Sequence, residues 1–223
     1  MIESISFSGG SWIGLCYYLG CLSYLITVVP DDIITLGSSA GAWAATALHI
    51  RHKIDINNIK KKVYRLMDMV GYYPVHCEKY LEDFFNEVFV FDVSNIDGLK
   101  NRLHISISHV EKTKLKNEMV QNFHDKAKLK KTLIDSSRLP FIIGTGKVID
   151  GALTSNQPVL NDKTLKINCI TGLFGAHICP SKWINPLYVV FPPSFKMREK
   201  IYMLGFNDTK KYIIKHKCFK KDI

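Results

Sequence analysis

Residues 31–48 read DDIITLGSSAGAWAATAL, and this stretch decides the fold. The mostly apolar residues 33–36 predict a short strand, and the small and apolar residues after the glycine-rich turn predict a helix. Ser39 lies between Gly37 and Gly41, and a serine in this setting, after a strand and before a helix, is the nucleophile-elbow pattern GxSxG. The glycines are expected for steric reasons, because a Cβ at either position would collide with adjoining backbone. The elbow would present the Ser39 hydroxyl at a helix N-terminus, where free N–H groups and the helix dipole favour developing negative charge.

The whole chain has the size and composition of one globular domain. Its 223 residues are 47% hydrophobic and 22% charged, which predicts a single domain over residues 1–223. A basic helix and tail is expected from about residue 194 to residue 223. Residues 12–29 are uncharged and approach the length of a membrane span, but glycine, tyrosine and serine interrupt them and Pro-Asp-Asp follows. We therefore expect residues 12–29 to form a buried helix in the core of an α/β fold.

Cysteine usage and the start of the chain both indicate a cytoplasmic setting. The sequence has six cysteines and no CxxC pair, so neither a zinc site nor a disulfide framework is expected. It shows no basic segment followed by an apolar run and a cleavage site, which is the pattern of a secretory leader. Reduced thiols in the cytoplasm are the expectation.

The net charge of +10 fits two readings, either solvated basic helix faces or attraction to an anionic surface. Basic residues cluster at 60–62, 126–131 and 210–221. The sequence has no RNA-binding motif and no interleaving of aromatic and basic residues, so nucleic acid is not expected. A negatively charged membrane surface fits better, and peripheral association with membranes is the corresponding prediction.

A second glycine-rich turn precedes the elbow. Residues 3–8 alternate apolar and polar side chains, which predicts a strand that runs into Gly9, Gly10 and Ser11. Backbone N–H groups at the mouth of the following helix have no partner within the helix and form a cradle for an anion. Both turns follow neighbouring strands, so they should lie at one sheet edge. An oxyanion is favoured over a phosphate, because the turn has neither a longer glycine motif nor a lysine.

The remaining patterns predict alternating helices and strands. Helices are expected over 57–70, 125–136 and 194–215, and strands over 103–110, 117–123, 147–152, 165–170 and 187–191. Residues 71–74 should end a helix, and residues 95–98 should form a turn. The aromatic-rich residues 78–91 are expected in the core, with the lining of an acyl pocket as the alternative.

A serine nucleophile needs a base, and two arrangements are compatible with the sequence. One is a triad of Ser39, Asp150 and either His177 or His216. The other is a dyad in which Asp150 takes the Ser39 proton directly. The dyad is favoured, because only one strand and one helix precede the elbow and neither histidine has a recognisable loop context. Asp150 follows a short apolar strand and precedes Gly151, and partial burial would make its carboxylate more basic.

The ordered motifs resemble the patatin-like phospholipase family. They are SGGSWIG at 8–14, GSSAG at 37–41 and DGA at 150–152, and further support comes from LHISISHV, SSRLPF, SNQPV and LGFND, while residues 57–99 match least. The resemblance implies a three-layer α/β/α fold with a mostly parallel central sheet. It also implies a lipid acyl hydrolase that acts on membrane or storage lipids and needs neither a metal nor a cofactor. Ser39 would be the acyl-forming nucleophile and Asp150 the base, and the amides of Gly9, Gly10 and Ser11 would hold the oxyanion.

The glycine loop departs from the family pattern at two positions. Many members carry a third glycine and then an arginine or lysine, whereas this chain has Ser11 and Ile13. We expect the Cβ of Ser11 to narrow the approach of substrate. The animal branch of the family also lacks the basic residue, so a subfamily trait in an active enzyme is the interpretation. The rival readings are a soluble enzyme that hydrolyses small esters or transfers their acyl groups, and a non-catalytic module that binds lipid surfaces.

Overall fold

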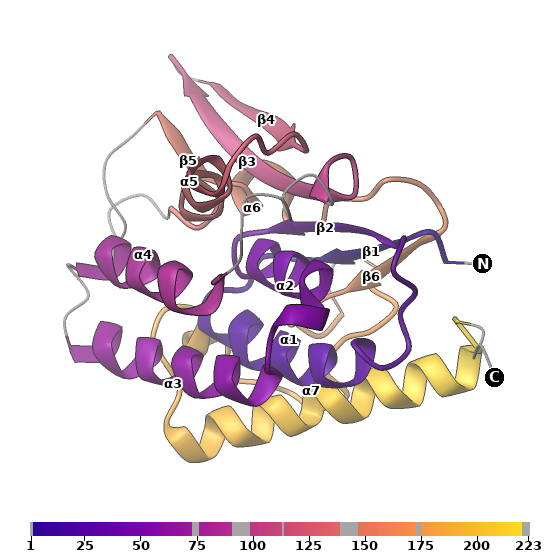
Figure 1. Ribbon diagram of the computed structural model, residues 1–223. Coiled ribbons are helices and arrows are strands. Elements are labelled where there is room, and N and C mark those ends of the chain that lie inside the picture. The colour runs from indigo at the N-terminus through magenta and orange to yellow at the C-terminus, as the bar shows by residue number, and fades with distance from the viewer. Residues whose placement is uncertain are drawn as a thin grey trace.

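A six-stranded sheet organises the chain (Figure 1). The computed structural model describes residues 2–72, 76–90, 99–112, 114–138, 147–172 and 175–219. The strands are β1 (Ser4–Phe7), β2 (Ile34–Ser38), β3 (Leu103–Glu111), β4 (Lys114–Val120), β5 (Val148–Asp150) and β6 (Thr164–Ile167). They lie in the order β4-β3-β2-β1-β6, and β5 pairs with β3. Strands β6, β1, β2 and β3 are parallel, while β4 and β5 run antiparallel to β3.

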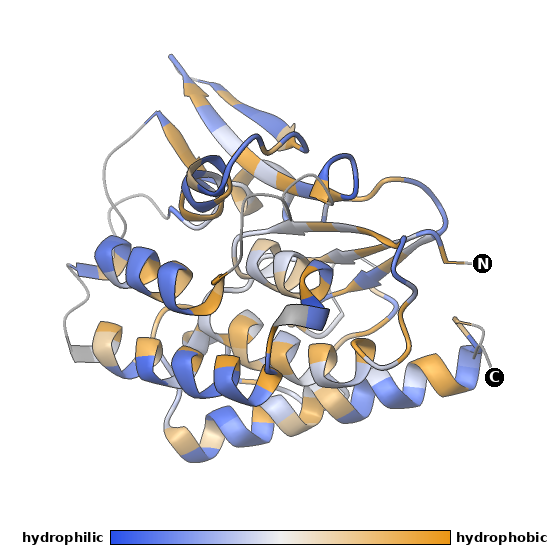
Figure 2. Cartoon of the chain, viewed as in Figure 1, coloured by the Kyte–Doolittle hydropathy of each residue, from blue (hydrophilic) through white to orange (hydrophobic). Residues whose placement is uncertain are grey.

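Helices flank this sheet, and most of them gather on one side of it (Figure 1). The α-helices are α1 (Ser11–Leu25), α2 (Ala40–His49), α3 (Ile56–Tyr72), α4 (Cys77–Val88), α5 (Lys126–Ser136), α6 (Ala152–Ser155) and α7 (Phe195–His216), and the short 3₁₀ helices are η1 (Arg51–Lys53) and η5 (Pro186–Val189). Helix α2 packs on the sheet, and α1 packs beside α2. The Tyr18 ring of α1 meets the Phe7 ring of β1 edge to face, with ring centroids 5.3 Å apart. Helix α7 covers the outer side of α1. In Figure 2, hydrophilic and hydrophobic residues alternate along α3 and α4, as expected of amphipathic surface helices.

The predicted α/β class and the mostly parallel central sheet are confirmed. Residues 12–29 form the buried helix α1 and the turn after it, as predicted, and no helix in the described part of the chain is long and apolar enough to cross a membrane. The strand predicted over 165–170 ends at Ile167. The turn predicted at 95–98 lies outside the described residues.

The strand predicted over 187–191 is wrong. This segment contains the 3₁₀ helix η5, which Pro186 starts and the side chain of Asn185 caps by accepting the Leu187 N–H at 3.0 Å. A proline at the first position and an asparagine cap favour a helical turn over the extended backbone that the apolar run suggested.

Helices α1 and α7 cross at a contact that only glycine allows. A Cβ on Gly20 would lie 1.9 Å from the Tyr202 carbonyl oxygen, and one on Gly205 would lie 2.1 Å from the Tyr17 carbonyl oxygen. The two backbones therefore touch directly at these positions. This close approach fixes the long C-terminal helix against the helix that carries the glycine loop.

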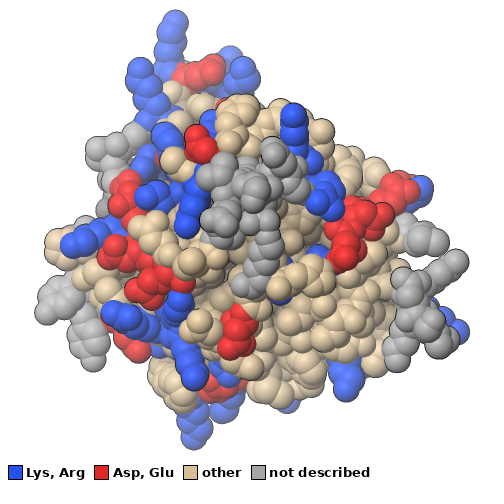
Figure 3. Space-filling model, in the orientation of Figure 1, with Lys and Arg blue, Asp and Glu red and all other residues tan. Residues whose placement is uncertain are grey.

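Basic and acidic side chains are mixed on the face of the molecule that Figure 3 draws. Figure 3 shows acidic side chains interspersed among the lysines and arginines on the side of α3 and α4. Lys60 pairs with Glu199 at 2.8 Å and also lies over the Tyr202 ring. In the middle of α3, Arg65 lies 3.8 Å from Glu87. Part of the predicted attraction to an anionic surface is thus neutralised within the molecule.

Candidate active site

The elbow predicted from the sequence is present between β2 and α2. Ser39 joins the two elements with φ 51° and ψ −127°, a backbone conformation that residues with a Cβ rarely adopt. A Cβ on Gly37 would lie 2.2 Å from the Gly41 carbonyl oxygen, and one on Gly41 would lie 2.3 Å from the Phe7 carbonyl oxygen. The steric reason given for both glycines is therefore confirmed. The strained turn leaves Ser39 at the N-terminus of α2.

Strand β3 brings Asp150 beside this turn. On one edge of β3, Ser106 pairs with Ser38, the last residue of β2, and the next residue, Ile107, pairs with Asp150. Strand β5 thus continues along the same edge of β3 where β2 stops. Gly151 follows at a point so close to β3 that an added Cβ would lie 1.9 Å from the Ser106 carbonyl oxygen. The sheet register therefore brings Ser39 and Asp150 together.

Asp150 is a buried carboxyl with few polar partners. Its side chain accepts the Ala152 N–H at 2.7 Å, and the residue is 1% exposed. Burial raises the pKa of Asp150 to about 6, although hydrogen bonds from Ala152 and from the Ser39 hydroxyl oppose this rise. A carboxylate that is more basic than usual and lies beside a serine hydroxyl can accept its proton.

The glycine loop lies directly over these two residues. A Cβ on Gly9 would lie 3.4 Å from the Ser39 Cβ and 2.6 Å from the Ala152 Cβ. The Gly9 N–H donates to the Asn156 carbonyl oxygen at 3.0 Å, so it is already engaged. Within the described residues, the N–H groups of Gly10 and Ser11 have no acceptor. Of the three amides predicted for the oxyanion hole, the structure leaves two available.

Ser11 occupies a backbone conformation that favours glycine. Its φ is 47°, in the left-handed region that side chains disfavour. Ser11 also lines the cavity next to Ser39, and the expected narrowing of the approach by its Cβ stays a prediction.

Residues at the end of α5 and just after it fix the backbone of both candidate catalytic residues. The sequence did not predict this role. The Ser39 N–H donates to the Ser136 Oγ at 2.9 Å, and that hydroxyl donates to the Ser106 carbonyl oxygen at 2.7 Å. The Asp150 N–H donates to the Arg138 carbonyl oxygen at 2.8 Å. The only signal in the sequence was the SSRLPF segment, which supported the resemblance without suggesting a role.

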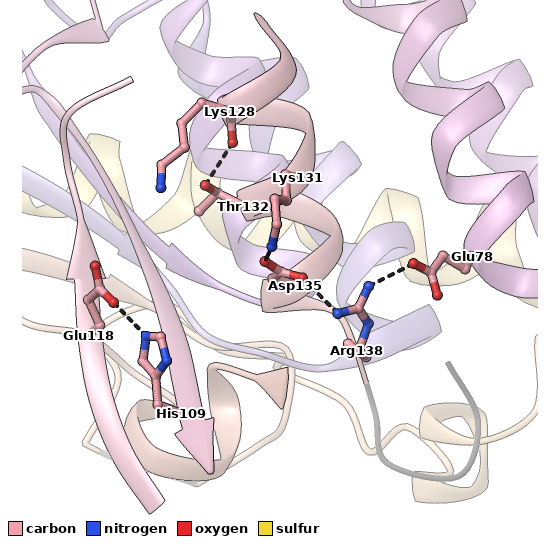
Figure 4. Close-up of polar contacts among 8 residues, drawn as sticks. All are labelled: Glu78, His109, Glu118, Lys128, Lys131, Thr132, Asp135 and Arg138. Carbon is pink, nitrogen blue, oxygen red and sulfur yellow. Dashed lines mark hydrogen bonds and ion pairs between the residues drawn. The ribbon is translucent and has the colours of Figure 1, made fainter. Parts of the chain in front are cut away.

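An ion-pair cluster anchors this end of α5 to α4 (Figure 4). The Arg138 guanidinium pairs with Asp135 at 2.8 Å and with Glu78 at 2.7 Å, and Asp135 also pairs with Lys131. Asp135 and Arg138 are largely buried, so these contacts are less screened than surface pairs. The cluster fixes the backbone that accepts the Asp150 N–H.

An apolar cavity opens next to Ser39. It has a volume of about 100 Å³ and is lined by Ser11, Trp12, Leu15, Ser39, Ala40, Trp43, Cys77, Leu81, Ser137, Val189 and Val190. A smaller void of about 30 Å³ shares Leu15, Ala40 and Trp43 with it and reaches Phe84 and Phe89. Trp43 is fixed by donating its indole N–H to the Ser137 Oγ at 2.9 Å. The aromatic-rich segment around α4 is therefore both part of the core and part of the wall beside the nucleophile.

The two histidines of the alternative triad make other contacts. The Nδ1 of His177 accepts the Lys166 N–H at 3.0 Å, and its ring lies near Tyr212. The His216 ring stacks on the Tyr212 ring, with ring centroids 4.3 Å apart. In the described part of the chain, neither histidine contacts Ser39 or Asp150. The geometry favours a serine–aspartate pair.

The fold and the site together have the form of a serine–aspartate pair on an α/β sheet, with a glycine loop above the serine. Over nearly its full length the chain is similar to patatin-like phospholipase domain-containing protein 4 of Homo sapiens. The identity is 27% over 254 aligned residues, which cover 97% of this chain and 98% of the human protein. This similarity supports the family resemblance.

Two further comparisons bear on the fold. A scan against protein-family models gives no match. The crystal structure of VipD from Legionella pneumophila is similar with a TM-score of 0.52 and covers 96% of this chain and 67% of VipD. At 12% sequence identity this similarity concerns the fold alone.

Proposed function

We propose that the chain is a lipid acyl hydrolase that cleaves carboxylic esters through Ser39 and Asp150. The observation that carries the proposal is the sheet register, which puts a buried carboxyl with a pKa of about 6 against the serine of a strained elbow. The full-length similarity to a patatin-like phospholipase domain protein supports the same class of reaction.

The first half of the reaction forms an acyl-enzyme. The Ser39 Oγ attacks the ester carbonyl carbon while the Asp150 carboxylate takes the hydroxyl proton. The carbonyl oxygen becomes negatively charged, and the free N–H groups of Gly10 and Ser11 stabilise it by about 3 kcal/mol each, as single donors do in comparable sites. The intermediate collapses as the C–O bond breaks, and the leaving alcohol takes the proton from Asp150.

The second half releases the acid. A water molecule attacks the acyl carbon and gives a proton to Asp150, and the same amides stabilise the second tetrahedral intermediate. The bond to the Ser39 Oγ then breaks, and the serine takes its proton back from Asp150. The carboxylic acid leaves, and the enzyme returns to its starting state.

The cavity favours an acyl group over a polar substrate. Most of its wall consists of aliphatic and aromatic side chains, and the deeper void behind Trp43 is almost entirely apolar. Its volume of about 100 Å³ is below the 300–1,000 Å³ or so that usually encloses a whole small ligand. A long-chain lipid, whether a phospholipid or a neutral lipid, would therefore be held only around its ester bond.

The experiment is labelling with a fluorophosphonate probe followed by peptide mapping. We expect the probe to bond to Ser39, and we expect Ser39→Ala and Asp150→Asn to abolish labelling in folded protein. Matched controls are Ser181→Ala and Asp162→Asn, which change an exposed serine and an exposed aspartate and should label normally.

Two outcomes would contradict the proposal. Folded wild-type protein that never labels would favour a non-catalytic module that binds lipid surfaces. Loss of labelling in His177→Ala, with the fold intact, would instead revive the Ser-His-Asp arrangement.

A further inference from the structure

A segment beside the active site exposes an unusual number of large apolar side chains. Trp183 is 76% exposed, Leu187 59%, Phe191 63% and Phe195 65%. They fall within a short stretch that includes η5 and the first residue of α7. We call this set of four side chains the apolar face. Isolated exposed apolar residues are normal, but a cluster of large ones marks an interaction surface.

The backbone below the apolar face is fixed. The N–H groups of Val190 and Phe191 donate to the Leu187 carbonyl oxygen at 3.0 and 2.9 Å. The buried Arg198 donates to the Pro193 carbonyl oxygen at 2.7 Å and pairs with Asp68 at 2.7 Å. The four side chains are therefore presented by an anchored loop, and little conformational entropy is lost when a partner covers them.

The apolar face adjoins the mouth of the cavity. Val189 and Val190, which lie between Leu187 and Phe191, line the cavity next to Ser39. The Trp12 indole N–H donates to the Val190 carbonyl oxygen at 3.3 Å and ties the segment to the helix of the glycine loop. A surface that covered the apolar face would therefore lie close to the cavity next to Ser39.

Charge around the apolar face favours an anionic partner. Exposed Lys182 and Lys196 flank it, and the sequence contains no aspartate or glutamate between Asp162 and Glu199. Asp208 reaches the start of the segment, but its carboxylate is engaged by the Tyr17 hydroxyl and the Ser181 N–H. Lysines beside exposed aromatic rings suit the headgroup region of a membrane, where positive charge and apolar bulk are both favoured.

The lysines of the C-terminal tail lie elsewhere. Helix α7 begins at the end of the sheet towards which β1 runs and finishes beside the N-terminus at the opposite end (Figure 1). Exposed Lys210, Lys211 and Lys215 are on its second half. Contact through these residues would place the lipid at the end of α7 that lies away from the segment lining the cavity.

We propose that the apolar face is the membrane-docking surface of this protein, with Trp183, Leu187, Phe191 and Phe195 entering the headgroup region of an anionic bilayer. The inference rests on the proposed function, because it assumes that the ester at Ser39 comes from that bilayer. Docking here would deliver a lipid to the cavity while the rest of its chain stays in the membrane, which agrees with the small cavity volume.

The test is co-sedimentation with vesicles of phosphatidylcholine and phosphatidylserine, in the Ser39→Ala background so that no lipid is consumed. We expect Trp183→Ser, Leu187→Ser and Phe191→Ser each to weaken binding roughly tenfold. Leu115→Ser is the matched control, since Leu115 is 49% exposed on β4, away from the site, and should bind like the parent.

Tryptophan fluorescence gives an independent readout. Trp183 is 76% exposed whereas Trp12 and Trp43 are 8% and 5% exposed, so a blue shift on adding vesicles would report the environment of Trp183. We expect the shift in the parent, its loss in Trp183→Phe, and quenching by lipids that carry bromine on the acyl chains.

The outcomes separate this inference from the proposed function. Undiminished vesicle binding by all three serine variants, or loss of binding only on changing Lys210 and Lys211 to glutamine, would overturn the docking surface. Failure of fluorophosphonate labelling would overturn the catalytic proposal instead. In wild-type background, Leu187→Ser should hydrolyse a water-soluble short-chain ester at the normal rate and lose activity only on vesicles.

Discussion

The buried carboxyl of Asp150 should lower the stability of the protein at neutral pH, and Asp150→Asn should remove that cost. In the folded chain its pKa is about 6, compared with the ordinary 3.8 of an aspartate. At about 1.4 kcal/mol for each pKa unit, the difference corresponds to about 3 kcal/mol of unfolding free energy. Asparagine keeps an oxygen for the Ala152 N–H and carries no charge, so the variant should fold without this penalty.

The sign of the pH dependence follows from proton binding. Between about pH 4 and pH 6 the folded state keeps the proton on Asp150 while the unfolded chain has lost it. The contribution of this group to stability is therefore complete below about pH 4 and falls as the pH rises to about 6. Wild type and Asp150→Asn should have similar unfolding free energies at about pH 4, and the variant should be more stable by up to about 3 kcal/mol at about pH 8.

Urea unfolding of both proteins across this pH range measures the difference directly. Comparison with Asp162→Asn, an exposed aspartate, corrects for the general effect of removing one negative charge. The same carboxyl should control catalysis, so kcat/KM of the wild type should rise with pH through about 6, and Asp150→Asn should lower kcat by about 100-fold or more. A variant that is less stable than wild type at about pH 8 would refute the reasoning, because it would mean that the folded state prefers the charged carboxylate.

Three further substitutions test the site and the fold. Ser39→Gly should be more stable than Ser39→Ala by about 1–3 kcal/mol in thermal unfolding, because glycine relieves the strained backbone at φ 51°; equal stability would mean that the turn relaxes. Ser136→Ala should lower stability by about 1–3 kcal/mol, because it leaves the Ser39 N–H without its acceptor. It should also lower kcat by about tenfold and leave KM for a short ester unchanged. A purely structural role of Ser136 would leave kcat intact. Gly205→Ala should destabilise the protein by about 3 kcal/mol or more. The control Gly71→Ala has nothing within 4 Å of the added carbon and should be neutral or stabilising. Similar chemical denaturation curves for the two variants would refute the close contact of α1 and α7.

Much of the fold could be predicted because its signals are local. A glycine on either side of Ser39 and the apolar strand before Asp150 are readable within a few residues, and the alternation in β3 and the amphipathic pattern of α3 follow from period alone. The strand predicted over 187–191 was wrong because an apolar run of that length fits several structures, and the decisive signals were the proline and asparagine before it.

The rest of the site depends on contacts between distant residues. Nothing near Gly9 indicates that its N–H is taken by Asn156, and nothing near Ser136 indicates that its hydroxyl accepts the Ser39 N–H. Both contacts arise because β5 and the end of α5 meet the elbow along β3, which is set by sheet register. A register between segments this far apart has no local pattern in one sequence.

One arrangement of strands accounts for both the stability lost by burying the Asp150 carboxylate and the chemistry proposed for the site. Strand β2 has to stop at Ser38 for the elbow to turn, and the edge of β3 that it vacates would expose unpaired backbone groups. Antiparallel β5 covers that edge and ends at Asp150, so the carboxyl is buried by the same pairing that protects β3. Burial raises the pKa of the carboxyl and so destabilises its charged form, and in the proposed reaction the same rise would let the carboxylate take a proton from serine without a histidine. Under the proposed mechanism, stability and activity should change in opposite directions wherever solvent access to Asp150 is altered.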